Sequence, residues 1–209
     1  MRLIFSSLMI ALLMLGCSSP KTSYYKLNAE PIPAMPSVSN KMRIMVGPVN
    51  VPARMDRPQL VTQAAGSEVE VYEYHRWAGS FKGDVGKVIS SSLARNLSTP
   101  NVWNFAQSTQ AQYDYQVLID VQSLESVQGG DVVVDVLWTI KPSMPVAKNQ
   151  THAASTKCVP QELMGRSLVR EPVSGSGFDA LLNAQSRAFS KVGDEIAKRF
   201  GESECRSPA

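Results

Sequence analysis

Alternating apolar and polar side chains predict several β-strands. Residues 43–51 are rich in Ile, Val and Met, and residues 69–74 alternate valines and tyrosines with glutamates, so both segments are predicted strands. Two longer β-branched runs, 113–127 and 132–140, are separated by Gly129-Gly130-Asp131. Because turns of this composition favour tight hairpin loops, the two runs are predicted to pair as a β-hairpin.

Two segments have the spacing of an amphipathic helix, with apolar side chains three or four positions apart. The first is weakened near its start by Gly83 and Gly86 and cannot continue far beyond Pro100. Its apolar positions are Val85, Val88, Ile89, Leu93 and Leu97. The second segment is longer and carries Phe178, Leu181, Leu182, Gln185, Phe189, Val192, Ile196 and Phe200 along one face. An apolar face of this kind is normally buried against another element.

A further strand is predicted near residues 151–158, after a turn at Pro142 and Pro145. The order of elements is then strand, strand, helix, several strands and helix, which is typical of an α+β fold. We expect a mainly antiparallel or mixed sheet with the two helices packed on one face. Asp120 and Asp135 lie inside the long apolar runs and are expected to face solvent.

The first twenty residues have the pattern of a lipoprotein signal peptide. Arg2 is followed by a mainly apolar run over residues 3–15, then by the small residue Gly16 and by Cys17, as in a secretory signal and its cleavage site. A cysteine directly after that site is the bacterial lipobox pattern. The alternatives are a plain secreted protein with a structural cysteine, or an uncleaved anchor, although the run is shorter than the roughly 20 residues of a transmembrane helix.

The expected organisation is a signal peptide at residues 1–16, a lipidated N-terminus and extended tether at 17–41, and one globular domain at 42–209. Prolines among small and polar residues make most of the tether unsuited to regular structure. The apolar patch Tyr24-Tyr25-Lys26-Leu27 interrupts the tether and is able to dock as a short strand. The remaining length suits a single hydrophobic core.

Cysteine usage agrees with an exported protein. Once Cys17 is lipidated, Cys158 and Cys205 remain, and an even pair in an oxidising compartment is a candidate disulfide. Two free thiols are the alternative, because the sequence does not show whether the two Cβ atoms meet. His75 and His152 are the only histidines, and they lack the close paired spacing of a zinc site, so no metal is expected.

The sequence offers little for catalysis. Its formal net charge is +3, which is too close to neutral to indicate a nucleic-acid surface. The glycine-rich segment 173–177 only resembles a nucleophile elbow, and the spacing of a phosphate-binding loop is absent around Lys87. No spacing of carboxylates singles out an acid–base pair. We therefore expect a protein that is not an enzyme and that carries no cofactor.

The densest aromatic segment contains Tyr74, His75, Arg76 and Trp77, and a glycine-containing loop follows it. Two interpretations are open. The segment can be the end of a strand that covers the core. It can also be a contact patch for a protein partner, since Tyr, Trp and Arg are favoured as interface anchors.

Together these motifs resemble the ABC-type transport auxiliary lipoproteins, the PqiC (YmbA) group. The resemblance is carried by Cys17 in its lipobox, Tyr24-Tyr25-Lys26-Leu27, Asp56-Arg57-Pro58-Gln59-Leu60-Val61, Tyr74-His75-Arg76-Trp77-Ala78 and the helix ending Leu93-Ala94-Arg95-Asn96-Leu97. It spans nearly the whole mature chain. One departure is the segment Gly79-Ser80-Phe81-Lys82-Gly83, where such proteins often have a proline-containing turn into the helix.

The resemblance implies a membrane-anchored, non-enzymatic component of an intermembrane lipid transport system. Its partners would be a periplasmic MCE-domain protein and an inner-membrane complex that moves phospholipid or other apolar cargo; a homo-oligomer is left open. The lipid anchor would hold the domain at the periplasmic face of the outer membrane, where it would dock the MCE-domain partner. The alternative is a periplasmic carrier lipoprotein that itself binds lipid in a cavity.

Replacing the lipobox thiol tests the anchor. Cys17→Ala is expected to abolish acylation and to release the protein from membranes, because the thiol is the predicted attachment atom. Metabolic labelling with a fatty acid measures the first effect, and persistent label in the variant would refute the assignment. In Gram-negative bacteria an Asp directly after the lipidated cysteine usually retains a lipoprotein at the inner membrane. Here Ser18 follows Cys17, so density-gradient fractionation should place the wild-type protein in the outer membrane.

Overall fold

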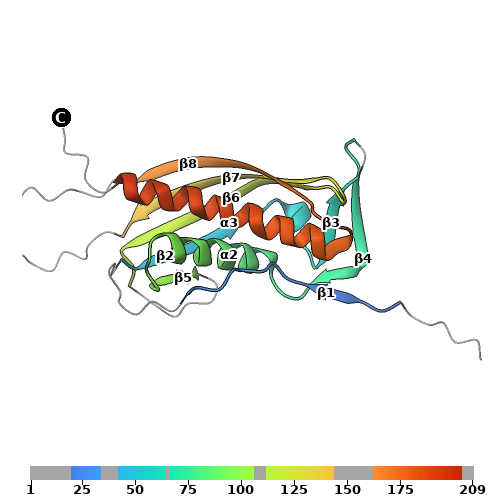
Figure 1. The fold of residues 1–209 in the computed structure, drawn as a ribbon, viewed down its shortest axis with the longest axis horizontal. Coiled ribbons are helices and arrows are strands. Elements are labelled where there is room, and N and C mark those ends of the chain that lie inside the picture. The colour runs from blue at the N-terminus through green and yellow to red at the C-terminus, as the bar shows by residue number, and fades with distance from the viewer. Residues whose placement is uncertain (1–19, 34–41, 65, 106–111, 144–161, 204–209) are drawn as a thin grey trace, which may run out of the picture.

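The computed structural model of the protein describes residues 20–33, 42–64, 66–105, 112–143 and 162–203. These residues form two β-sheets and two α-helices (Figure 1). The elements are β1 (Ser23–Tyr25), β2 (Ile44–Asn50), a 3-10 turn (Ala53–Met55), β3 (Gln59–Gln63), β4 (Val69–Trp77), α2 (Phe81–Asn96), β5 (Val102–Asn104), β6 (Tyr115–Ser126), β7 (Asp131–Pro142), β8 (Leu163–Pro172) and α3 (Gly177–Ser203).

Five strands form a mixed sheet in the order β5-β2-β6-β7-β8. β2 runs parallel to both β5 and β6, whereas the β6–β7 and β7–β8 pairs are antiparallel. The predicted hairpin joins β6 to β7. In its turn the Val127 amide donates to the Asp131 carbonyl at 3.1 Å, and the Gly130 amide donates to the Val127 carbonyl at 3.1 Å. The hairpin prediction is therefore confirmed.

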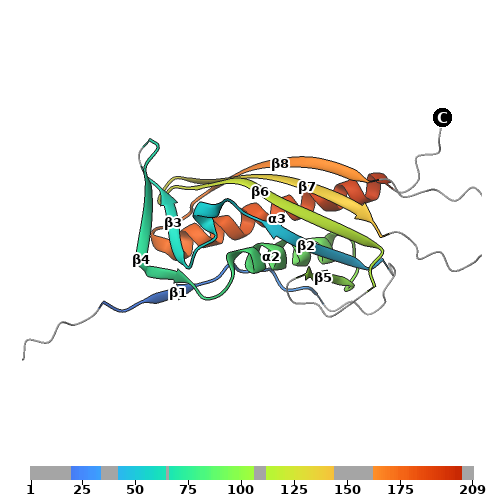
Figure 2. The same ribbon diagram turned by 180° about the vertical axis from the view of Figure 1, so that it is seen from behind.

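A smaller sheet has the order β1-β4-β3. β3 and β4 are antiparallel neighbours, and β1 pairs with β4 in parallel. The smaller sheet lies at one end of the molecule, beside the start of α3 (Figure 2). β1 comes from the segment before residue 42, so part of the predicted tether contributes a strand to the folded domain.

Both helices cover one face of the five-stranded sheet and pack against each other (Figure 1). α2 begins where the Ser80 hydroxyl accepts the Gly83 amide at 3.3 Å, which satisfies an otherwise unpaired helix N–H. The helices approach closely at Gly193, where a Cβ atom would lie 2.7 Å from the Ser92 Cβ. Beside this contact the Ser92 hydroxyl donates to the Asp194 carboxylate at 2.5 Å. The predicted α+β fold, with two helices on one face of a mixed sheet, is confirmed.

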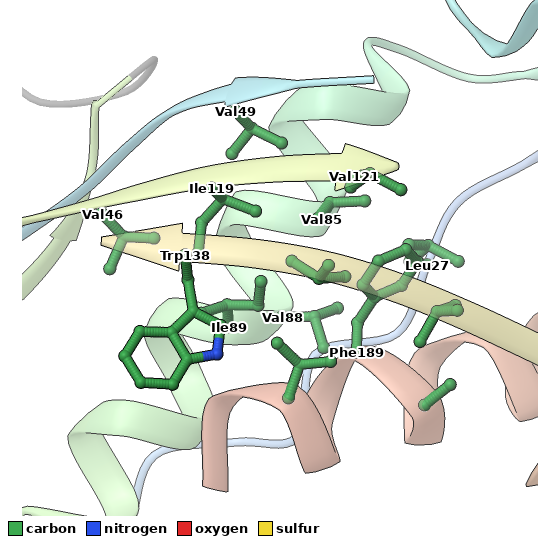
Figure 3. Packing of buried hydrophobic residues seen from close by; sticks show 14 of the residues in the cluster. Leu27, Val46, Val49, Val85, Val88, Ile89, Ile119, Val121, Trp138 and Phe189 are labelled. Carbon is green, nitrogen blue, oxygen red and sulfur yellow. The ribbon is translucent and has the colours of Figure 1, made fainter. Parts of the chain in front are cut away.

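The hydrophobic core lies between this face of the sheet and the two helices. Figure 3 shows side chains from α2, α3 and the central strands meeting in this layer. Ile89 from α2, Phe189 from α3 and Ile119 from β6 are almost completely buried. Leu27 joins the same core from the N-terminal segment and keeps only 3% of its surface exposed.

Two strand-level predictions turn out differently. β8 was not predicted, and the predicted strand at residues 151–158 lies outside the described residues. Asp120 is exposed as expected. The expectation for Asp135 is wrong, because Asp135 is only 8% exposed. The Arg166 guanidinium from β8 covers it and donates to it at 2.8 Å, and this hydrogen bond lowers the pKa of the Asp135 carboxyl.

Gly165 on β8 allows the Trp138 indole to lie against the strand. A Cβ atom at Gly165 would lie 2.1 Å from Cζ2 of Trp138, and the indole is fixed by a 3.0 Å hydrogen bond to the Ser167 hydroxyl.

Gly165→Ala is therefore expected to lower the free energy of unfolding by about 1–3 kcal/mol through overpacking. Urea unfolding measures this. Gly79→Ala is the control, since nothing lies within 4 Å of a Cβ atom there, and an equal loss in both variants would contradict the explanation.

A buried carboxylate connects β8 to α3. Glu171 is 4% exposed; Arg187 donates to it at 3.1 Å, and the Lys191 ammonium pairs with it. Burial raises the pKa of Glu171, but the hydrogen bonds from Lys191 and Arg187 outweigh burial and leave that pKa below its usual value. The ionised carboxylate therefore stabilises the fold above the ordinary glutamate pKa of about 4.3, and this contribution is lost as the pH falls through the lowered value.

Glu171→Gln is expected to lower the free energy of unfolding at neutral pH by about 1.5–3 kcal/mol, the range for hydrogen bonds to a charged group. The difference between wild type and variant should shrink as the pH falls below about 4, because wild-type Glu171 then becomes neutral as well. Urea unfolding at a series of pH values measures both effects. A difference that stays constant down to pH 2 would show that the charge of Glu171 does not contribute.

Candidate functional site

The N-terminal segment is fixed to the domain before it reaches β2. Ser23 and Tyr25 pair with His75 and Trp77 in the parallel β1–β4 ladder. The Ala78 amide also donates to the Tyr25 carbonyl at 2.7 Å. β1 is therefore an edge strand of the smaller sheet, and β4 is its central strand.

Contacts after β1 extend this attachment onto both helices. The Leu27 amide donates to the Asp84 carboxylate of α2 at 3.2 Å, and burial raises the pKa of Asp84. The Asn28 amide donates to the Ser186 hydroxyl of α3 at 3.0 Å. Two residues further on, the Glu30 carboxylate pairs with Arg95 near the end of α2.

Four rings form an aromatic cluster behind the smaller sheet, made of Tyr25, Tyr72, His75 and Phe178. The Phe178 ring lies 4.2 Å from the His75 ring and 4.7 Å from the Tyr72 ring, measured between centroids. The Tyr25 hydroxyl and Nδ1 of His75 are 2.8 Å apart. Burial, together with a 2.6 Å hydrogen bond to Glu70, raises the pKa of Tyr72. The cluster attaches β1, β4 and the start of α3 to one another.

β4 divides the predicted contact residues between two faces. His75 belongs to the aromatic cluster, and Trp77 is only 9% exposed and stacks on Phe81 with centroids 4.8 Å apart. Tyr74 is 48% exposed. Arg76 is partly exposed and donates to the Glu73 carbonyl at 2.8 Å. From Tyr74 to Trp77 successive strand residues point to opposite faces, so the four residues do not form one surface. A register shift in the β3–β4 ladder between Tyr72 and Arg76 lets Tyr72 join His75 on the inward side.

The outward face gains a residue that sequence reasoning did not include. Tyr24 is 65% exposed and is the register partner of Arg76 across the β1–β4 ladder. Tyr24, Tyr74 and Arg76 are called the outer patch below. The available signal was the pair of tyrosines in the apolar patch at residues 24–27. The sequence could not show that these tyrosines pair with residues about fifty positions later.

Other predicted sites fall outside the described residues. These are Cys17, Cys158, Cys205 and His152. The lipid attachment and the Cys158–Cys205 disulfide therefore stay predictions. Within the described ranges, no three His, Cys, Asp or Glu side chains are grouped so that they could hold a metal ion. None of the helices in the same ranges is long and apolar enough to cross a membrane.

The cavity behind the outer patch is small. It lies between the smaller sheet and α3, is lined by residues such as Leu60, Trp77 and Leu181, and has a volume of about 20 Å³. This is room for about one water molecule. A larger groove is open to solvent between residues 29–32, α2 and β5, with Lys87 and Trp103 on its walls.

Comparison with solved structures supports the fold. A crystal structure of an uncharacterized protein has a TM-score of 0.63 and 15% identity, and the match covers 87% of this chain and 99% of the other. A crystal structure of a Xanthomonas campestris protein, assigned to the family DUF330, has a TM-score of 0.60 and 16% identity, with 86% and 94% of the two chains covered. At these identities the likeness shows the fold alone. No curated protein matches the sequence.

The sequence itself provides the assignment. Residues 25–197 match the family described as the ABC-type transport auxiliary lipoprotein component. The match begins at Tyr25 in β1 and runs into the last third of α3, so it includes the smaller sheet, the five-stranded sheet and both helices. The chain therefore belongs to the family of ABC-type transport auxiliary lipoprotein components.

Proposed function

We propose that this protein is a lipid-anchored docking component of an intermembrane lipid transport system. Acylated at Cys17, it stands at the periplasmic face of the outer membrane and binds the distal end of a periplasmic MCE-domain protein. That partner belongs in turn to an inner-membrane ABC-type complex that moves phospholipid or other apolar cargo. Family membership supports the transport role, and the role itself requires no catalysis.

The observation that carries the proposal is the outer patch. Two exposed tyrosines and a partly exposed arginine lie on a strand pair whose other face is fixed in the aromatic cluster and the core. Tyr and Arg are enriched among residues that dominate binding energy, and rigid support lowers the entropy lost on association. Tyr74 and Arg76 are thus the proposed partner contacts, while His75 and Trp77 hold their strand in place.

The hollows of the described residues favour docking over a carrier function, because none of them is both enclosed and large. A carrier would enclose the acyl chains of its lipid, and ligand pockets commonly measure about 300–1,000 Å³. The cavity between the smaller sheet and α3 holds about 20 Å³. The groove beside residues 29–32 is larger, about 460 Å³, and therefore within that range, but it is partly open to solvent rather than enclosed, with Lys87 and Ser90 among the residues that line it.

The two functions differ in what copurifies with the protein. If the protein docks a partner, its delipidated domain should capture an MCE-domain protein and contain no stoichiometric phospholipid by mass spectrometry. Phospholipid that copurifies at one molecule per domain, without any capture of an MCE-domain protein, would favour the carrier.

Single substitutions on β4 should separate binding from stability. Tyr74→Ala and Arg76→Ala are each expected to weaken partner binding by about 2 kcal/mol, roughly thirtyfold, without changing the melting temperature. Trp77→Ala should instead destabilise the fold by about 3–5 kcal/mol, because it empties a buried site. Calorimetric titration with the MCE-domain protein and thermal unfolding measure the two quantities.

Leu168→Ala is a matched control for these variants. Leu168 is 70% exposed on β8, on the other sheet, so its truncation should change neither affinity nor melting temperature. If Tyr74→Ala and Arg76→Ala bind as wild type does, the outer patch is not the partner contact. If both lower the melting temperature as Trp77→Ala does, the patch is structural.

A further inference from the structure

The docked N-terminal segment leaves very little free chain between the domain and the predicted lipid. β1 pairing, the burial of Leu27 and the Glu30–Arg95 ion pair all hold the chain from Ser23 onward. Six residue steps separate Cys17 from Ser23, which is at most roughly 20 Å of extended chain. A free tether up to residue 41 would instead reach roughly 80 Å.

This short connection leaves from one end of the molecule. β1 lies at the end formed by β3 and β4, and β8 begins at the opposite end (Figure 1, Figure 2). An anchor attached through residues 18–22 therefore holds the β1 end toward the membrane.

The surface of this segment suits the lipid headgroup region. Lys21, Tyr24 and Lys26 are all exposed, Tyr24 to 65%, and they are called the basic strip below. The sequence contains no acidic residue from Cys17 to Ala29. Tyrosine is enriched at membrane interfaces, and lysines near an anionic surface are attracted to it.

Acidic groups on the neighbouring elements β4 and α2 are already engaged within the domain. Glu73 is paired with Arg76, with 3.4 Å between guanidinium and carboxylate. Asp84 accepts the Leu27 amide at 3.2 Å. Among the described residues neither Lys21 nor Lys26 forms an ion pair that would turn it inward, and Lys26 acts on Asp84 only through space.

We propose that the basic strip lies on the headgroup surface of an anionic bilayer, so that the domain rests on the membrane with its β1 end down. This inference depends on the acylation of Cys17 proposed above. Because Tyr24 pairs with Arg76, the outer patch then begins at the membrane surface. The partner must accordingly extend to the bilayer itself in order to bind.

A fluorescent probe on the strip tests this orientation. The full mature chain, acylated at Cys17 and carrying Cys158→Ser and Cys205→Ser, is labelled with an environment-sensitive dye at Tyr24→Cys. The matched control carries the dye at Met164→Cys, because Met164 is 75% exposed in β8 at the opposite end. Each protein is incorporated into vesicles of phosphatidylethanolamine and phosphatidylglycerol, with or without a nitroxide-bearing lipid.

The dye at position 24 is expected to shift to shorter wavelength and to be quenched by the nitroxide lipid, while the dye at position 164 stays in water. Equal exposure of both dyes to water, in an acylated protein that floats with the vesicles, would overturn the orientation and leave the anchor intact. Absence of the acyl group from the wild-type protein would overturn both. Protection of position 24 only after addition of a protein partner would assign the strip to that partner instead.

The lysines supply a second, independent measurement. Lys21→Ser and Lys26→Ser should each lower about fivefold the ratio of molecules with the β1 end on the bilayer to molecules with that end away from it. The change is measured as reduced quenching at position 24. Lys141→Ser is the control, because Lys141 is exposed in β7, at its end far from the β6–β7 turn. The shift should vanish in vesicles of phosphatidylcholine alone. Equal quenching in the lysine variants and the control would show that charge does not hold the strip on the membrane.

Discussion

The structure depends on the packing of one helix against both sheets. α3 has 27 residues and is therefore about 40 Å long. Near its start Phe178 enters the aromatic cluster of the smaller sheet, and in its middle Phe189 meets Phe81 with ring centroids 6.1 Å apart. Near its end the ring centroid of Phe200 lies 5.4 Å from that of Tyr115, at the start of β6. Because the two sheets share this helix, the smaller sheet has a fixed position although it contains only three strands.

That support explains how a short strand pair can present a rigid surface. An isolated pair of strands is marginally stable in water. Here the inward rings of Tyr25 and His75 are held by Phe178, and Trp77 is held by Phe81. The outward side chains on the same strands are thus placed by buried neighbours rather than by contacts of their own. Binding then requires little further ordering of the backbone, which favours recognition at this face.

The parts of the fold that could be predicted are those whose burial follows a simple period. Both helices and the β6–β7 hairpin have regular apolar faces, and the structure contains them. β8 was not predicted because its large apolar residues face solvent and its small residues face the core. Met164 and Leu168 are exposed, whereas Gly165 and Ser167 face the interior. Its inward residues are small because the Trp138 indole fills that space. The site was predicted only in part for a related reason, since a contiguous segment cannot show which residues a strand turns inward or that Tyr24 completes the patch.

The position of β1 gives the N-terminal segment two roles. It is the edge strand of the smaller sheet, and it is also where the chain from the predicted lipid anchor enters the domain. Tension on such an anchor would therefore reach β1 first, where Ser23, Tyr24 and Tyr25 pair with β4. Leu27 in the core and the Glu30–Arg95 ion pair lie further along the chain and resist the same load. Residues that attach the domain are thus direct neighbours of those proposed to bind the partner, so a pull on the anchor and the binding of the partner act on the same pair of strands.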